Sequence, residues 1–486
     1  MPAISVNLSF TSGVFGASWK KAVVLPLLKK QGLDLIPANY RPISNLTYVS
    51  KVVEKCALLQ FNDHLSNGDL LPSYQSAYRS NYSTETALMK IHCDILTAME
   101  NQKVIALVGL DLSAAFDTVD HAILLKTLSN MYGVQDDALS WFQSYLSNRS
   151  FYVSVQDASS DYKNTNFSVP QGSILGPVLY SAYASPLGGV INAFDINVMG
   201  YADDHALYKA FTPKGELERD AILNLERCLS EVHSWMNSNK LKLNPRKTEF
   251  ILFGSKHQLQ KCNSHSMVVS GIEVKKSTSI KYLGVYWDES LSFRQQIQAK
   301  CKTALFNLSR IRSIRKYLTI DICQTLASSL VLPHLDYSNT LYYDLPDCDI
   351  KQLQRVQNMT AKLVLGRGKF DSATDSLRSL HWLPIKSRIT YRIATYVYKC
   401  LHDLAPSYLK ELIIIRTGRT GLRSSSNTMG ILLDIPLTKR RTFKDRSFAV
   451  AAPVTWNSLP SSLHCINNYD NFKRKLKTFL FTQAFL

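Results

Sequence analysis

Three acidic side chains stand where metal-dependent chemistry could take place. Asp111 lies at the end of a predicted buried strand, residues 104–112, and Asp203 and Asp204 form the predicted turn of a hairpin, residues 197–208. Carboxylates at such places are costly to bury without a counter-charge. Mg²⁺ prefers oxygen ligands, and two ions about 3.5–4 Å apart can activate an attacking hydroxyl and stabilise a leaving pyrophosphate. The three acids are therefore candidate metal ligands.

Each of these features also has an ordinary structural explanation. Asp-Asp is a common turn dipeptide, and a single Asp after a strand is more often a cap or an ion-pair partner. The neighbouring sequence favours the functional interpretation, because the acids belong to an ordered series of short motifs. These motifs occupy residues 19–26, 39–44, 75–79, 83–86, 110–121, 169–177, 200–204, 241–249 and 282–285.

This series resembles the reverse transcriptase of non-LTR (LINE-type) retrotransposons, in the jockey-like and chicken-repeat-like group. The resemblance covers about residues 19–290, and residues 353–358, 380–384 and 456–460 look like motifs from the tails of such elements. It implies an RNA-directed DNA polymerase that transfers nucleotides from deoxynucleoside triphosphates onto a primer 3′-hydroxyl. The implied cofactors are two Mg²⁺ ions, with Mn²⁺ as a substitute. The implied partners are template RNA and a DNA primer or target DNA.

The resemblance also assigns catalytic roles to individual positions. Asp111 and Asp203 would hold the two metal ions, and Asp204 would be a lesser ligand of the same site. Lys247 matches the position proposed to protonate the leaving pyrophosphate, with a solvated lysine at a helix end as its alternative. Reactions of this kind depend mainly on positioning and on neutralising charge.

Further residues would form the nucleotide pocket. Phe116 stands where the family places a steric gate against the ribose 2′-hydroxyl, and core packing is its alternative role. Gln171 and Gly172 would shape the pocket floor, where a glycine lets the backbone approach closely. The candidates for gripping the triphosphate, each also explicable as a surface charge, are Arg41, Lys51 and Arg79. The residues that match the primer grip, or else a purely structural hairpin, are Tyr282, Leu283 and Gly284.

These observations predict an α+β fold of the right-hand polymerase type. We expect N-terminally truncated fingers at 1–100, a palm with a small antiparallel sheet at 101–290, a helical thumb at 291–370 and a basic, mostly helical region at 371–486. Apolar runs predict further strands at 249–253 and 280–286. Helical periodicity is found at 217–237, 297–311, 350–364 and 385–401, and residues 418–427 have a loop composition.

The charge distribution indicates a polyanionic partner. Residues 1–290 hold 26 basic and 26 acidic residues, so the whole net charge of +18 lies in residues 291–486, with 30 basic and 12 acidic residues. A basic region on a neutral body predicts nucleic acid before a membrane surface, and a solubilising surface is the alternative. No run approaches the roughly 20 apolar residues of a membrane span, so no membrane partner is expected.

The remaining features concern compartment and completeness. The nine cysteines are widely spaced and form no CxxC pair, which is typical of reduced intracellular thiols. Target-primed reverse transcription uses chromosomal DNA, so the resemblance implies the nucleus, with a cytoplasmic ribonucleoprotein phase. We find no endonuclease, RNase H or terminal zinc-knuckle motif, and therefore expect a shortened copy of such an element.

Two other functions fit the same sequence. A catalytically silent polymerase relic could still bind RNA or duplex nucleic acid through the basic tail. An RNA polymerase of similar palm architecture is the third hypothesis, but Phe116 argues against it, since a site for ribonucleotides would need a smaller residue there.

Overall fold

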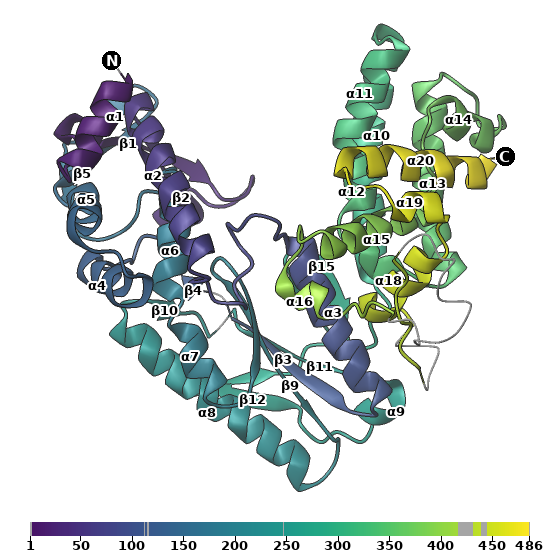
Figure 1. Ribbon diagram of the computed structural model, residues 1–486, viewed down its shortest axis with the longest axis horizontal. Helices are drawn as coiled ribbons and strands as arrows, with labels where there is room; N and C mark the ends of the chain where they lie inside the picture. The colour runs from purple at the N-terminus through teal and green to yellow at the C-terminus, as the bar shows by residue number, and fades with distance from the viewer. Residues whose placement is uncertain are drawn as a thin grey trace.

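The computed structural model describes residues 2–110, 112–113, 116–245, 247–416, 431–438 and 445–485, without the side chains of residues 2–5 and 112–113. Figure 1 shows two lobes joined at their base. Most of the purple, blue and teal helices form one lobe, and the green and yellow C-terminal helices form the other, together with the blue helix α3 (Thr84–Glu100). The strands of a central sheet lie at the base between the lobes.

The central sheet has four antiparallel strands in the order β11-β3-β9-β8. They are β3 (Val104–Leu110), β8 (Asn197–Tyr201), β9 (Asp204–Phe211) and β11 (Glu249–Phe253). The register pairs Leu110 with His205 and Tyr201 with Asp204, so the end of β3 and the β8–β9 turn lie at the same end of the sheet. The small antiparallel sheet predicted from the sequence is thereby confirmed.

Both faces of this sheet are buried, each against a different hydrophobic cluster. Along β3, Ile105 and Leu107 belong to one cluster, whereas Ala106 and Val108 belong to the other. Such alternation is the period of two that a strand imposes on its side chains. The first cluster continues into the C-terminal lobe, and the second continues into the N-terminal lobe.

The N-terminal lobe contains a second sheet, in which β1 pairs antiparallel with β2 and parallel with β5. Its strands are β1 (Lys21–Leu28), β2 (Tyr40–Leu46), β5 (Arg149–Val155), β6 (Ala158–Ser159) and β7 (Lys163–Thr165). The helices on this side of the central sheet are α1 (Pro2–Thr11), α2 (Tyr48–Asn67), α4 (His121–Tyr132), α5 (Asp136–Leu146), α6 (Gly176–Ala184), α7 (Leu187–Asn192) and α8 (Glu216–Ser238). The helix predicted at 217–237 lies within α8.

Smaller elements extend the region of the central sheet. They are β4 (Leu112–Ser113), β10 (Lys242–Leu243), α9 (Lys256–Leu259), β12 (Ser266–Val269), β13 (Ile272–Lys275), β14 (Ser279–Tyr282) and β15 (Val285–Asp288). The run 280–286, predicted as a strand, is therefore a hairpin. Its turn consists of Leu283 and Gly284, both at positive φ (45° and 75°), a combination that turns the chain within two residues.

The C-terminal lobe is helical and shares one hydrophobic cluster with α3 (Thr84–Glu100). Its helices are α10 (Arg294–Ile314), α11 (Ile320–Leu330), α12 (Leu332–Asp336), α13 (Asp347–Val364), α14 (Ala373–Ser379), α15 (Ile385–Leu401), α16 (Ser407–Lys410), α18 (Phe448–Asn457), α19 (Ser461–His464) and α20 (Tyr469–Phe485). The predicted helices at 297–311, 350–364 and 385–401 lie in α10, α13 and α15. The predicted loop at 418–427 lies outside the described residues. In the described part of the chain, no helix is both long enough and apolar enough to cross a membrane.

A buried carboxylate joins this lobe to the start of α3. Glu85 accepts hydrogen bonds from Arg392 Nε (2.8 Å), from the Tyr396 hydroxyl (2.9 Å) and from the Thr340 hydroxyl (3.0 Å). The Glu85 side chain is only 5% exposed, whereas that of Arg392 is 49% exposed. The beginning of α3 is therefore fastened to α15 by an ion pair with one buried partner.

We expect Arg392→Met to lower the free energy of unfolding by about 2–3 kcal/mol, because it leaves a buried carboxylate without its cation. This loss of stability is smaller than that expected for breaking a fully buried ion pair, because Arg392 is half exposed. Urea unfolding followed by tryptophan fluorescence measures the change. The matched control is Lys386→Met, which breaks an exposed pair with Asp347 (66% and 65% exposed) and should lower the free energy of unfolding far less, because exposed ion pairs add little stability. Equal losses in the two variants would show that the Glu85 contacts add no special stability.

Candidate active site

The turn between β8 and β9 consists of Ala202 and Asp203, since Tyr201 already pairs with Asp204 across it. The predicted turn at Asp203 and Asp204 is therefore wrong by one residue. The physical reason is that Ala202 takes a left-handed backbone conformation, with φ of 58°, which suits a two-residue hairpin turn. This conformation costs an L-residue about 1–2 kcal/mol, and the sequence alone does not favour it at an alanine.

The Asp203 backbone is held from inside the sheet by His205. The imidazole Nδ1–H donates to the Asp203 carbonyl oxygen (3.1 Å). Burial lowers the pKa of His205, which is fully buried, and this favours the neutral ring. Because Nδ1 carries the proton, Nε2 is an acceptor, and it has no hydrogen-bond partner among the described atoms.

A cavity of about 860 Å³ opens beside this turn. It brings together six of the residues predicted from the sequence, although they come from segments far apart in the chain. These residues are Arg41, Phe116, Gln171, Gly172, Asp203 and Lys247. The cavity thus combines carboxylate, amide, aromatic and cationic side chains, and carboxylates are ligands that divalent cations such as Mg²⁺ accept.

The floor of the cavity is tied to the N-terminal lobe by a close backbone contact. Gly172 has φ of 123°, and a Cβ atom added to it would lie 2.4 Å from the Ser44 carbonyl oxygen of β2. The Ser44 N–H donates to the Gln171 carbonyl oxygen (2.6 Å). A glycine is therefore required at 172 because the loop passes directly against β2.

The Gln171 side chain is fixed by an acid that the sequence analysis did not single out. Its Nε2 donates to both carboxylate oxygens of Asp117 (3.0 Å each). Burial raises the pKa of Asp117, and the hydrogen bond from Gln171 opposes this rise. Asp117 itself lines the cavity. The only sequence signal for it was its place in the motif 110–121, next to Phe116.

Phe116 packs against the core and also lines the cavity. Its ring stacks on that of Tyr180 at 5.0 Å between centroids and packs against the N-terminal cluster. The same side chain lines the cavity and is only partly buried. Burial, followed by the nearby charge of Asp203, raises the pKa of Tyr180 well above its usual value. The aromatic pair therefore forms a rigid wall next to Asp203.

Two of the predicted phosphate-binding residues lie outside the cavity lining. Arg79 donates to the carbonyl oxygens of Pro72 (2.9 Å) and Gln75 (3.3 Å), and its guanidinium lies over the Tyr82 ring. Arg79 is thus engaged within its own loop. Lys51 lies in the first turn of α2 and is partly buried. Of the three candidates, only Arg41 lines the cavity.

The predicted primer grip also lies outside the cavity lining but is joined to the β8–β9 hairpin. The buried Tyr282 donates its hydroxyl to the Met199 carbonyl oxygen of β8 (3.0 Å). Burial, with a smaller contribution from the charge of Asp204, raises the Tyr282 pKa well above its usual value. The turn that follows it contains Leu283 and Gly284, and the Leu283 carbonyl oxygen accepts a hydrogen bond from Tyr337.

The metal-binding interpretation depends on which residues lie at the end of the sheet that contains the β8–β9 turn. Asp111 lies outside the described residues, and it directly follows Leu110, whose pairing with His205 places the end of β3 beside the turn. Among the described residues, no group of three or more His, Cys, Asp and Glu side chains forms a metal site. Asp203 and Asp204 supply carboxylate oxygens of the kind that Mg²⁺ prefers.

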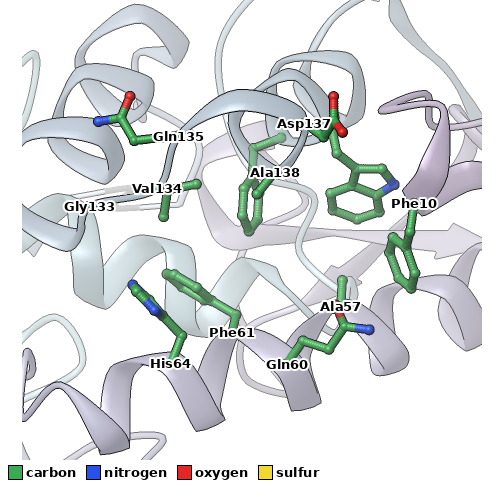
Figure 2. Close-up of a pocket in the computed structure, with 12 residues that line it drawn as sticks. Phe10, Ala57, Gln60, Phe61, His64, Gly133, Val134, Gln135, Asp137 and Ala138 are labelled. Atoms are coloured by element: carbon green, nitrogen blue, oxygen red, sulfur yellow. The ribbon is translucent and has the colours of Figure 1, made fainter.

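A second cavity, of about 470 Å³, lies in the N-terminal lobe. Figure 2 shows Phe10, Phe61 and Val134 among its mostly apolar lining, with His64 at its edge. The His64 imidazole donates to the Tyr132 carbonyl oxygen (2.6 Å). None of the predicted site residues lines this cavity, so the candidate active site is the cavity at the β8–β9 turn.

Comparisons with known proteins identify the family to which the chain is similar. The family model described as "Reverse transcriptase (RNA-dependent DNA polymerase)" matches residues 28–287. The chain is 26% identical over 408 residues to "Probable RNA-directed DNA polymerase from transposon BS" of Drosophila melanogaster, covering 81% of this chain and 44% of that protein. It is also 26% identical over 386 residues to "RNA-directed DNA polymerase from mobile element jockey" of Drosophila melanogaster, covering 78% and 41%.

The chain therefore spans less than half the length of these curated relatives. Among solved structures, an apo telomerase from Candida tropicalis aligns with 78% of this chain and 70% of its own, at 11% identity and a TM-score of 0.40.

We expect Gly172→Ala to lower the free energy of unfolding by roughly 2–4 kcal/mol, because it adds a steric clash to a backbone conformation that alanine disfavours. The matched control is Gly133→Ala. Gly133 also has positive φ (63°), but a Cβ atom there would meet nothing within 4 Å, so the cost should be only about 1–2 kcal/mol. Thermal and urea unfolding of both variants test this. Equal losses would mean that the contact with Ser44 does not constrain the loop.

Proposed function

Because the chain belongs to the reverse transcriptase (RNA-dependent DNA polymerase) family, we propose that it is an RNA-directed DNA polymerase of the non-LTR retrotransposon type. The observation that carries the proposal is the cavity at the β8–β9 turn, which joins Asp203 to Phe116, Gln171, Gly172 and Lys247. The proposed reaction is attack of a primer 3′-hydroxyl on the α-phosphate of a deoxynucleoside triphosphate, with pyrophosphate as the leaving group.

The proposed metal ligands are Asp203, Asp204 and Asp111. When bound, two Mg²⁺ ions would activate the hydroxyl and neutralise charge on the phosphates. The protein's own side chains would do the positioning. The Asp203 carboxylate is carried on a turn whose backbone is fixed by His205, so its direction is set before substrate binds.

The other cavity residues would bind the nucleotide. Arg41 lies on the β2 side of the cavity and can make a two-pronged contact with a triphosphate. Lys247 is exposed and lines the same cavity, where an ammonium group could give a proton to pyrophosphate. The Phe116 ring, backed by Tyr180, would exclude a ribose 2′-hydroxyl and so favour deoxynucleotides.

The primer–template would be held by the helical lobe. The exposed face of α10 carries Lys302, Arg310 and Arg312 together with the exposed ring of Phe306. Basic side chains interleaved with aromatic rings suit nucleic-acid backbones and bases.

The proposed domains are fingers (1–100), palm (101–290), thumb (291–370) and a basic C-terminal region (371–486). The compartment that this proposed function requires is the nucleus, because its target would be chromosomal DNA.

Asp203→Asn should abolish primer extension while leaving the affinity for primer–template nearly unchanged, because it removes a metal-binding charge without changing the size of the side chain. The assay is deoxynucleotide incorporation on an RNA template with a DNA primer, in Mg²⁺ and again in Mn²⁺. The matched control is Asp195→Asn, since Asp195 is exposed and lies before β8, at the opposite end of the hairpin.

Comparable extension by Asp203→Asn would refute the assignment of the metal site. A folded wild-type chain that binds primer–template without extending it would favour the silent relic.

Replacing Lys302, Arg310 and Arg312 by Gln should weaken primer–template binding and flatten its dependence on salt. Each lost phosphate contact reduces the slope of log K against log salt by about 0.7–0.9, so the triple variant should lose roughly 2 from the slope. Fluorescence anisotropy at several salt concentrations measures it.

The matched control replaces Lys103, Lys214 and Lys256 by Gln. These exposed lysines lie near the opposite end of the central sheet, because β3 begins at Val104 opposite Phe211 and β11 ends at Phe253. The slope should stay that of the wild type. Equal changes in the two triple variants would show that α10 has no particular role in binding.

A further inference from the structure

The segment 74–77 lies along β8, the edge strand of the central sheet. The Gly200 N–H donates to the Tyr74 carbonyl oxygen (2.9 Å), and the Ser76 N–H donates to the Gly200 carbonyl oxygen (2.9 Å). Gln75 and Gly200 form a parallel bridge. A short piece of chain from the N-terminal part thus completes the sheet immediately before the turn that carries Asp203.

The Gln75 side chain extends this pairing into the turn itself. Its Oε1 accepts hydrogen bonds from the N–H groups of Ala202 (3.0 Å) and Ala77 (3.0 Å), and its Nε2 donates to the Ala202 carbonyl oxygen (3.4 Å). Gln75 is only 2% exposed. The side-chain amide therefore binds both backbone polar groups of Ala202, as the backbone of a neighbouring strand residue would.

This arrangement explains how an alanine keeps a disfavoured backbone conformation. Ala202 has φ of 58°, and such a conformation persists in a non-glycine residue only where its surroundings impose it. Gln75 holds the Ala202 backbone on one side, and His205 holds the Asp203 carbonyl oxygen on the other. A release of Ala202 would let the turn relax and redirect the next side chain, which is Asp203.

We propose that Gln75 is a positioning residue that holds the Ala202–Asp203 turn in its one conformation and so directs Asp203 into the cavity. Its catalytic consequence rests on the proposed function. Gln75 does not itself line the cavity, and it acts through the backbone of Ala202. A small misplacement of a catalytic group can reduce a rate on the order of 10²-fold.

The test compares wild type with Gln75→Met, which keeps the length of the side chain but cannot form these hydrogen bonds. Hydrogen exchange by mass spectrometry, resolved to the Ala202 amide, reports on the turn without any need for activity. We expect exchange there to become at least about tenfold faster, because the amide loses its acceptor. Primer extension should show kcat reduced on the order of 10²-fold, with KM for the deoxynucleotide changed much less.

The matched control is Gln357→Met, which also removes a buried glutamine with a hydrogen bond to a backbone carbonyl, that of Leu383 (2.9 Å). Gln357 lies in α13, and its loss should change neither Ala202 exchange nor kcat.

A rescue variant adds Ala202→Gly to Gln75→Met. Glycine adopts positive φ readily, so the double variant should recover part of kcat, which a mere packing role for Gln75 would not produce.

Unchanged exchange at Ala202 in Gln75→Met overturns the proposal, whatever the activity. Faster exchange with unchanged kcat in an active enzyme also overturns it, since the turn would then not need to be held. If the wild type extends no primer, the proposed function fails, and Ala202 exchange alone decides whether Gln75 holds the turn. If Gln75→Met does not fold, Gln75→Leu replaces it in the same two assays, since it also lacks both the acceptor for the Ala202 N–H and the donor to the Ala202 carbonyl oxygen.

Discussion

The structure depends on burial of the central sheet on both faces. Side chains of β3 alternate between two hydrophobic clusters, so a slip of one residue would move Ile105 and Leu107 into the cluster that now holds Ala106 and Val108. Packing of unlike side chains on the two faces therefore fixes the register. The register in turn determines which residues lie at the end of the sheet where β3 ends and the β8–β9 turn is located.

The residues of the proposed site lie on loops, and these loops are tied to rigid elements. The loop at 170–172 is fastened to β2 through Ser44, and the β14–β15 hairpin is fastened to β8 through the Tyr282 hydroxyl. The Tyr408 hydroxyl of α16 contacts Ser76 (3.0 Å), so the C-terminal region reaches the segment that pairs with β8. The proposed polymerase reaction would need groups held in place more than covalent chemistry, and these contacts would supply that rigidity.

Sequence reasoning found what depends on residue type and local pattern. The strands of the sheet, the helices α8, α10, α13 and α15, and six of the cavity residues followed from apolar runs, helical periodicity and motifs. It missed what depends on tertiary contacts. The position of the turn rests on positive φ at Ala202, which Gln75 imposes from 127 residues away. Asp117 becomes recognisable only through its hydrogen bonds with Gln171, and Arg79 serves its own loop.

The Glu85 contacts determine the order in which the molecule can be assembled. This carboxylate near the start of α3 meets Thr340, Arg392 and Tyr396, which follow it by 255, 307 and 311 residues. At about 5–20 residues per second, a ribosome needs roughly 15–60 s to make the intervening chain. During that time α3 lacks the lobe that covers it, and apolar surface next to the sheet stays open to chaperones or to other chains. The nascent chain can complete the Glu85 contacts only after α15, which carries Arg392 and Tyr396, has been synthesised.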